Sequence, residues 1–274
     1  MPIASLTDHG VLELTGEDRV SFLQGLVSND VTVVAPGRAV FAALLTPQGK
    51  WLLDLFLFAD GERLLLETER AAVPGLAQRL GRFRLRARVT LRDVSDALTV
   101  QVGWGGVLLP DGIAASDPRL PAAGWRALRE VPLAADVDIA AWDRHRLSLG
   151  LPDGSRDLIA EQTVLLEAGY DELHGISWTK GCYMGQELTA RTKYRGLIKR
   201  RLVPVAIEGP PPPPGTLITR DGVELGEMRS ARAARGIAQL RLEALAGGPL
   251  LCAEATLRPA VPDWMALPVA TDPA

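Results

Sequence analysis

Residues 177–196 read SWTKGCYMGQELTARTKYRG, and no other stretch of the 274-residue chain is so dense in reactive side chains. Gly181 and Gly185 flank the tripeptide Cys-Tyr-Met, so the backbone there is free to adopt a tight conformation that a Cβ atom would resist. The run 186–192 contains good helix formers and no breaker, which predicts a short helix. Cys182 is therefore expected in a loop just before a helix N-terminus.

Cys182 is a candidate reactive thiol for electrostatic reasons. The partial positive charge of the helix N-terminus, together with Lys180 and Arg191, would favour the thiolate, which attacks electrophiles or binds metal. The competing interpretation is that Cys182 packs as a small hydrophobic residue, as free cysteines commonly do, and that the two glycines are ordinary turn residues. Charged and glycine neighbours on both sides favour the reactive interpretation.

The string KGCYMGQE at 180–187 closely resembles the signature of the YgfZ family, whose mitochondrial relatives are iron–sulfur assembly factors of the Iba57 type. These proteins share their fold with the T-protein of the glycine cleavage system, a folate-dependent aminomethyltransferase. The resemblance extends to EDRVSFLQGLVSNDV at 17–31, LTPQGKWLLDLFLF at 45–58 and LEAG at 166–169. Together these segments cover most of the first 200 residues.

The resemblance implies an α+β fold of the T-protein/YgfZ type, with several subdomains, antiparallel sheets flanked by helices, and a small C-terminal β-barrel. Residues 1–198 are expected to form the T-protein-like folate-binding region, including a ferredoxin-like subdomain at about 51–104, and residues 199–274 the barrel. The residue patterns agree, because strand and helix segments alternate in the first hundred residues. Beyond Arg201, short β-like runs parted by turn residues are typical of a small barrel or sandwich.

The segment RFRLRARV at 82–89 alternates arginine with apolar residues, which predicts a strand from Phe83 to Leu91 with guanidinium groups along one side. Such a face is either simply solvated or a binding surface for anions, such as the glutamate tail of a folate or RNA phosphates. The whole chain has a net charge of −3 and a pI of about 5.7. Any site for a polyanion must therefore be local.

Asp54 interrupts the apolar strand WLLDLFLF, and on a period of two it shares a face with Leu52 and Phe56. An unpartnered buried carboxylate costs several kcal/mol, which favours a polar pocket over a plain core position. The resemblance places Asp54 at the pterin site and gives Glu167 the place of a glutamate that hydrogen-bonds the amino-pyrimidine edge of the pterin. Family members often have Pro-x-Glu where this chain has LLE at 165–167, so a surface glutamate remains the alternative.

The expected site has a catalytic part and a folate-binding part. Cys182 is expected to carry the essential chemistry, with Lys180 beside it. Tetrahydrofolate or a derivative is the expected cofactor, and its expected ligands are Asp54, Glu167, Tyr183, Gln186, Glu187, Arg191 and Arg195. Two cysteines 70 positions apart and three scattered histidines cannot supply a complete cluster or zinc site, so no stably bound metal is expected.

The resemblance implies a tetrahydrofolate-binding protein that supports the assembly or repair of iron–sulfur enzymes. Its expected partners are a reduced folate and, transiently, iron–sulfur client or carrier proteins, and the sequence leaves open whether it turns over a substrate. One alternative is a folate-dependent aminomethyltransferase. Another is a binding protein linked to RNA modification, which would use the arginine-rich strand. The N-terminal residues lack a basic leader and the longest apolar run is too short to span a bilayer, so a cytoplasmic protein without a membrane segment is expected.

Overall fold

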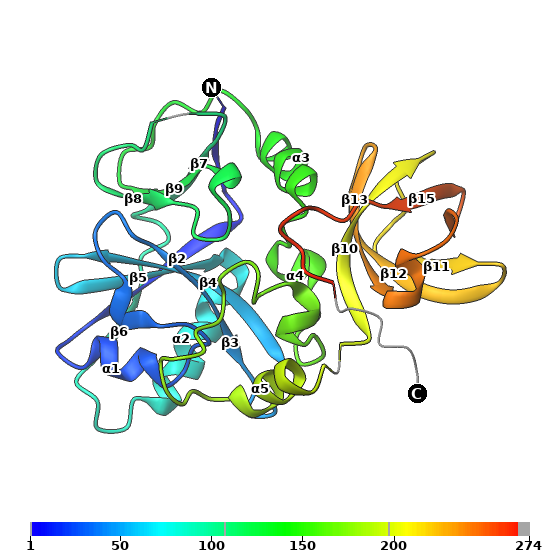
Figure 1. Ribbon diagram of the computed structural model, residues 1–274. Helices are drawn as coiled ribbons and strands as arrows, with labels where there is room; N and C mark the ends of the chain where they lie inside the picture. The colour runs from blue at the N-terminus through cyan, green and yellow to red at the C-terminus, as the bar shows by residue number, and fades with distance from the viewer. Residues whose placement is uncertain (1, 107, 197, 268–274) are drawn as a thin grey trace.

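The computed structural model describes residues 2–106, 108–196 and 198–267, which form two antiparallel sheets and a barrel (Figure 1). The larger sheet has the strand order β3-β4-β5-β2-β6, with β2 at His9–Thr15, β3 at Val40–Leu45, β4 at Trp51–Asp60, β5 at Arg63–Glu69 and β6 at Thr90–Asp93. The smaller sheet has the order β1-β7-β9-β8, with β1 at Ile3–Ser5, β7 at Thr99–Gly103, β8 at Ile113–Ser116 and β9 at Trp125–Arg129. The α-helices of the described residues are α1 at Arg19–Gln24, α2 at Val73–Phe83, α3 at Ile139–Leu149, α4 at Gly154–Asp157 and α5 at Gln186–Arg195.

The C-terminal part is a closed barrel, seen on the right of Figure 1. Its strand order is β10-β13-β12-β11-β14-β15, with β10 at Arg200–Glu208, β11 at Leu217–Arg220, β12 at Val223–Arg232, β13 at Arg235–Arg241, β14 at Leu250–Cys252 and β15 at Ala255–Pro259. Apolar side chains including Val203, Met228 and Cys252 fill its interior. The predicted α+β fold with a C-terminal barrel is therefore confirmed, while residues 268–274 of the expected barrel range lie outside the described residues.

The strand β4 lies in the interior of the larger sheet and is apolar on both faces. Phe56 and Phe58 pack into one core cluster, and Leu55 and Leu57 pack into another that also contains buried residues of α1 and α2. A near-continuous apolar run is what a strand covered on both sides requires. Asp54 has the same parity as Phe56, so it faces the cluster where the two sheets meet.

The predicted strand over Phe83–Leu91 is wrong. The helix α2 continues to Phe83, residues 84–87 form a turn closed by a hydrogen bond of 2.7 Å from the Ala87 amide to the Arg84 carbonyl, and β6 begins only at Thr90. Pro74 stands in the first turn of this helix, and the buried Val73, Leu76 and Leu80 give it an apolar face. The four arginines therefore do not line one face of a strand.

The range 51–104, expected to be one ferredoxin-like subdomain, contributes strands to two sheets. Strands β4, β5 and β6 pair within the larger sheet, whereas β7 pairs with β1 and β9 in the smaller one. The strand β2, from before this range, lies between β5 and β6. In the part of the chain that the structure describes, no helix combines the length and the apolar character needed to cross a membrane.

Buried charges tie the two sheets together. Glu67 of β5 accepts hydrogen bonds from Nε of Arg126 of β9, at 3.1 Å, and from Nη2 of the same guanidinium, and lies 2.9 Å from Nδ1 of His9 of β2. Asp117 lies 3.6 Å from Arg126 and accepts from Nη2 of Arg119 at 2.8 Å. Burial alone would raise the pKa of Glu67, but the Arg126 charge and the His9 hydrogen bond hold it at about 2. Glu67 is therefore charged at neutral pH.

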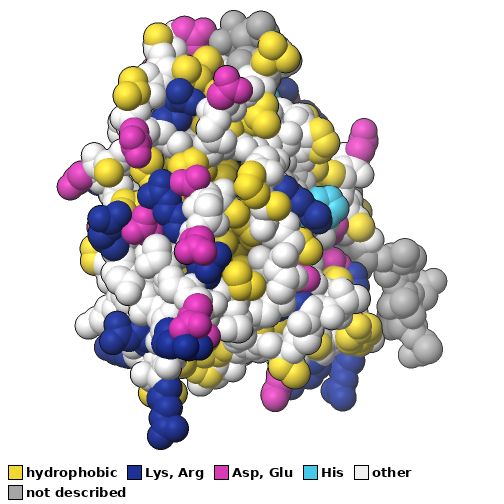
Figure 2. Space-filling model, turned by 90° about the vertical axis from the view of Figure 1, so that its left-hand side faces the viewer, with side chains coloured by type: hydrophobic (Ala, Val, Ile, Leu, Met, Phe, Trp, Pro, Cys, Tyr) yellow, Lys and Arg dark blue, Asp and Glu magenta, His cyan; other side chains and the backbone are white. Residues whose placement is uncertain are grey.

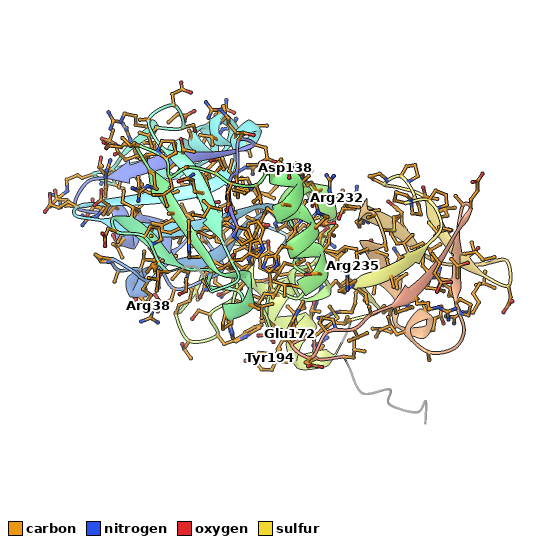
Figure 3. The ribbon with its side chains drawn as sticks, turned by 90° about the horizontal axis from the view of Figure 1, so that it is seen from above. Arg38, Asp138, Glu172, Tyr194, Arg232 and Arg235 are labelled. Atoms are coloured by element: carbon orange, nitrogen blue, oxygen red, sulfur yellow. The ribbon has the colours of Figure 1, made fainter. Side chains whose placement is uncertain are left out.

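A second group of charges, in which Arg146, Asp143 and Asp157 are buried, joins the helices to the barrel. Arg146 of α3 donates to Asp143 at 2.7 Å and to Asp157 of α4 at 2.6 Å. Ser230 of β12 donates to Asp157, and Arg232, which Figure 3 shows between α3 and the barrel, donates to Asp143; both distances are 2.5 Å. These contacts fix the barrel against the rest of the chain.

Candidate functional site

The loop 177–185 lies against the segment that follows α1. The Ser177 amide donates to the Ser28 carbonyl and the Met184 amide to the Gly25 carbonyl, both at 3.0 Å. The helix α5 begins directly afterwards at Gln186 and continues to Arg195, one turn further than the predicted 186–192. Cys182 therefore lies in a loop before a helix, as predicted, and the loop is anchored at both of its ends.

Two glycines far apart in the sequence hold this loop against the turn between β3 and β4. A Cβ atom on Gly185 would lie 2.5 Å from the Thr46 carbonyl oxygen and 3.0 Å from the Gly49 Cα atom. A Cβ atom on Gly49 would in turn lie 2.5 Å from the Gly185 carbonyl oxygen. Both residues have a φ of +83°, in the region that glycine adopts most readily. Gly185 is therefore more than a turn residue, because it permits the close contact between TPQGK and KGCYMGQE.

Lys180 anchors the loop to the carboxyl end of α1. Its Nζ donates to the Gln24 carbonyl at 2.5 Å and to the Val27 carbonyl at 2.6 Å. Carbonyl groups at a helix C-terminus carry partial negative charge and lack helical partners, so an ammonium group there is favourable. Burial lowers the pKa of Lys180 to about 8, against an opposing contribution from Asp30. The contacts give Lys180 a positioning role, since its hydrogen bonds point to the backbone.

Tyr183 and Gln186 contact each other at the end of the loop. The Tyr183 amide donates to Oε1 of Gln186 at 3.0 Å, and the buried Tyr183 ring lies with its centroid 5.1 Å from Nζ of Lys180. Burial raises the pKa of the Tyr183 hydroxyl. These two residues shape the backbone around Cys182.

Cys182 itself is exposed. The interpretation of this residue as a buried hydrophobic group is therefore wrong, and the thiol is open to partners. Glu187, Arg191 and Arg195 are exposed along one face of α5, at spacings of four residues. The structure thus brings Cys182 and these three charged side chains onto one loop–helix unit.

Asp54 lies in a different environment, between the sheets. Oδ1 accepts from Nε1 of Trp51 at 2.6 Å and from the hydroxyl of Tyr170, and Oδ2 accepts from the Gly154 amide at 3.2 Å. The Tyr170 ring is buried and stacks on Phe41 with centroids 4.9 Å apart. Sequence reasoning missed Tyr170, although it stands only three residues after Glu167. An aromatic ring of the chain itself therefore lies against the carboxylate.

The pH dependence of stability should report on Asp54. Burial raises its pKa to about 6, although Tyr170 and Trp51 oppose the shift. Between the usual pKa of about 3.9 and 6 the folded protein holds a proton that the unfolded chain releases, so the free energy of unfolding falls as pH rises, by at most about 3 kcal/mol. In urea titrations, the free energy of unfolding of wild type is expected to fall between pH 4 and pH 7 by this amount more than that of Asp54→Asn. An equal difference between the two proteins at both pH values would contradict the assignment.

Glu167 has other neighbours. It lies in a short 3₁₀ helix at Leu165–Ala168 and lines a cleft of about 310 Å³ together with Lys50, Arg200 and Arg229. Burial raises the pKa of Glu167, while the charges of Lys50 and Arg200 lower it. The two carboxylates expected at one pterin thus have different surroundings, one between the sheets and the other beside the barrel.

A larger cleft of about 710 Å³ opens next to the cysteine loop. Phe41 and Asp117 contribute to its wall, and so do Trp178 and Thr179, so that its lining comes within three residues of Cys182. No group of three or more His, Cys, Asp or Glu side chains within residues 2–106, 108–196 and 198–267 is placed to hold a metal ion.

The chain has a T-protein-like fold that carries an exposed cysteine loop. The glycine cleavage system aminomethyltransferase T from Bartonella henselae superposes with a TM-score of 0.76 over 94% of this chain and 84% of its own, at 13% identity, which shows a likeness of fold. Residues 199–267 match the family described as CAF17, C-terminal beta-barrel domain. The two matches together cover both the sheets and the barrel.

Sequence relatives then give the family. The human mitochondrial iron–sulfur cluster assembly factor IBA57 is 32% identical, over 93% of this chain and 82% of its own length. The homologue from Mycosarcoma maydis is 35% identical over 77% of this chain, and the match spans 59% of that longer protein. The chain belongs to the IBA57 family, which confirms the resemblance seen in KGCYMGQE.

The comparisons contradict the expectation of a cytoplasmic location. The human and Mycosarcoma maydis relatives and a mouse relative, 30% identical over 94% of this chain, are all named as mitochondrial proteins. The expectation rested on the composition of the N-terminal residues and on the apolar run WLLDLFLFA, neither of which identifies a compartment.

Proposed function

We propose that this protein takes part in iron–sulfur cluster assembly by offering the Cys182 thiolate as one ligand to a cluster carried by a partner protein. The observation that carries the proposal is the exposure of Cys182 on an anchored loop, in a chain of the IBA57 family. Iron–sulfur clusters are usually held by four cysteine thiolates, and the second cysteine of this chain, Cys252, is buried in the barrel. A single accessible thiol can therefore act on a cluster only together with ligands from another protein.

The loop supports this role because it holds Cys182 in place and leaves its side chain exposed. Lys180 binds carbonyl groups, and Gln186 binds the Tyr183 amide, so these neighbours fix the backbone. The exposed thiol stands in the loop four residues before Gln186, the first residue of α5. A thiolate held on a rigid loop loses little entropy when it binds iron.

Replacing Cys182 by serine tests the proposal. In cells that lack the native protein, Cys182→Ser is expected to lower the activity of a [4Fe–4S] dehydratase more than tenfold relative to wild type, because the hydroxyl is a far weaker ligand for iron. Cys252→Ala is the matched control and should retain activity, since Cys252 lies in the barrel core. Full dehydratase activity in cells with Cys182→Ser would falsify the proposal.

Folate binding, the finer part of the expectation, stays a prediction, and the packing around Asp54 disfavours a pterin at that carboxylate. Its oxygens already accept from Trp51, Tyr170 and Gly154, and the buried ring of Tyr170 stacks on Phe41. A pterin there would have to displace Tyr170 from the core. The proposed function therefore contains no step that uses a folate.

The aminomethyltransferase alternative rests on the fold alone, since the structural neighbour is 13% identical. The RNA-binding alternative depended on an arginine-lined strand, and those arginines lie in a helix end and a turn instead. Figure 2 shows acidic and basic side chains interspersed over the face it presents, without a broad region of one sign. No described feature favours either alternative over cluster assembly.

A further inference from the structure

Two large aromatic side chains are exposed beside the cysteine loop. Tyr194 on α5 is 78% exposed and Trp178 in the loop is 37% exposed, and their rings meet edge to face with centroids 6.2 Å apart. Figure 3 places Tyr194 at the edge of the molecule. Tyrosine and tryptophan are enriched in protein interfaces, where they supply much of the binding free energy. An exposed pair of this kind indicates a contact surface.

Trp178, one member of the pair, is held in a fixed arrangement. Asp171 accepts from Nε1 of Trp178 at 2.7 Å and, through its other oxygen, from Nζ of Lys193. The Lys193 ammonium in turn lies 5.3 Å from the centroid of the Trp178 ring. Side chains already fixed in the free protein lose little conformational entropy when a partner binds.

Basic side chains outnumber acidic ones along α5 and the residues after it, although the whole chain has a net charge of −3 and Asp171 pairs with Lys193 beside the aromatic pair. Between residues 187 and 200, one acidic side chain, Glu187, is exposed, together with the basic side chains of Arg191, Lys193, Arg195, Lys199 and Arg200. Complementary charge speeds association and selects the partner. The surface is therefore suited to an acidic protein.

The aromatic pair lies within reach of the thiol. Trp178 is four residues from Cys182, so their Cα atoms are at most about 14 Å apart. Tyr194 follows Gly185 by nine residues, which corresponds to about 13 Å along α5. A standard interface covers about 800 Å² on each protein, or roughly 30 Å across. One partner can therefore cover the aromatic pair and Cys182 together.

We propose that Trp178, Tyr194 and the basic side chains of α5 form the docking surface for the acidic partner protein that brings the cluster to Cys182. This inference rests on the proposed function and adds the place and charge of the contact. Single-stranded RNA also binds basic surfaces with aromatic residues, but it stacks its bases on open ring faces. Here Lys193 covers a face of Trp178 and the two rings meet at an edge, which favours a protein.

Site-specific photocrosslinking tests the docking surface in cells that depend on this protein. A benzoylphenylalanine at position 194 is expected to give a covalent adduct with an acidic protein that contains iron, identified by mass spectrometry and iron analysis. The matched control is the same group at position 223 in the barrel, where Val223 is 55% exposed. Its yield of this adduct should be at least tenfold lower. Equal yields, no adduct, or an adduct destroyed by ribonuclease would each overturn the proposal.

Variants separate docking from the chemistry of the thiol. With the crosslinker at position 194, Arg191→Glu combined with Arg195→Glu should reduce the adduct at least tenfold, whereas Cys182→Ser should leave it. A Trp178→Ala variant should lose dehydratase activity in cells while Cys182 keeps its wild-type rate of alkylation by iodoacetamide, which shows that the loop is intact. An unchanged adduct in the double charge reversal contradicts the docking surface. Full activity of Cys182→Ser with a persisting adduct instead rejects the proposed function and leaves the docking surface standing.

Discussion

Glu67→Gln is expected to lower the free energy of unfolding by about 3 to 5 kcal/mol at pH 7. Glu67 is fully buried and contacts both Arg126 and His9, so the substitution keeps the shape of the side chain but removes the charge that balances a buried guanidinium. Breaking one side of a buried ion pair costs more than the pair contributes, because the remaining ion stays desolvated. Urea unfolding followed by tryptophan fluorescence measures the difference.

The matched control is Glu17→Gln, because Glu17 pairs with Arg88 at the surface, where both side chains are more than half exposed. A surface pair contributes at most about 1 kcal/mol. The effect of Glu67→Gln should also depend on pH. The pKa of Glu67 is about 2 in the folded protein against a usual value of about 4.3, so its contribution is complete above pH 4.3 and is lost as pH falls toward 2. Equal costs of the two substitutions at pH 7 would contradict the role of the network.

Local sequence signals predicted those parts of the fold that depend on neighbouring residues. The helix after Gly185 and the strand-rich C-terminal region follow from helix formers, turn residues and short apolar runs close together in the chain. The same reasoning failed at residues 82–89, where a period of two coincided with the end of a helix. The start of that helix at Val73-Pro74 and its buried face override the alternation of arginine with apolar residues.

Local sequence patterns could not predict contacts between residues that are far apart in the chain. The sequence places Lys180 beside Cys182 and thus predicts activation of the thiol, but its ammonium binds carbonyls more than 150 positions earlier. Asp54 was expected to face a polar pocket, and nothing in the strand WLLDLFLF indicates that Tyr170 donates to it. Such partners are set by how the sheets and loops pack, which no periodicity reveals.

Gly185→Ala is expected to have the second large effect, because it would separate the cysteine loop from the turn that contains Gly49. A new Cβ atom would lie 2.5 Å from the Thr46 carbonyl oxygen, so the backbone has to move. The left-handed conformation adds about 1–2 kcal/mol for a residue with a side chain, and overpacking adds about 1–3 kcal/mol. The expected loss of stability is thus about 2–5 kcal/mol, measured by urea unfolding.

Gly181→Ala separates the two causes. Gly181 has a φ of +93°, also positive, but a Cβ atom there meets no other atom within 4 Å. Its cost should therefore be limited to about 1–2 kcal/mol. Gly49→Ala, which approaches the same contact from the other side, should resemble Gly185→Ala in stability, and both substitutions should lower dehydratase activity in cells because they displace the cysteine loop. If all three substitutions cost the same, backbone conformation alone explains them, and the contact between the two glycines does not position Cys182.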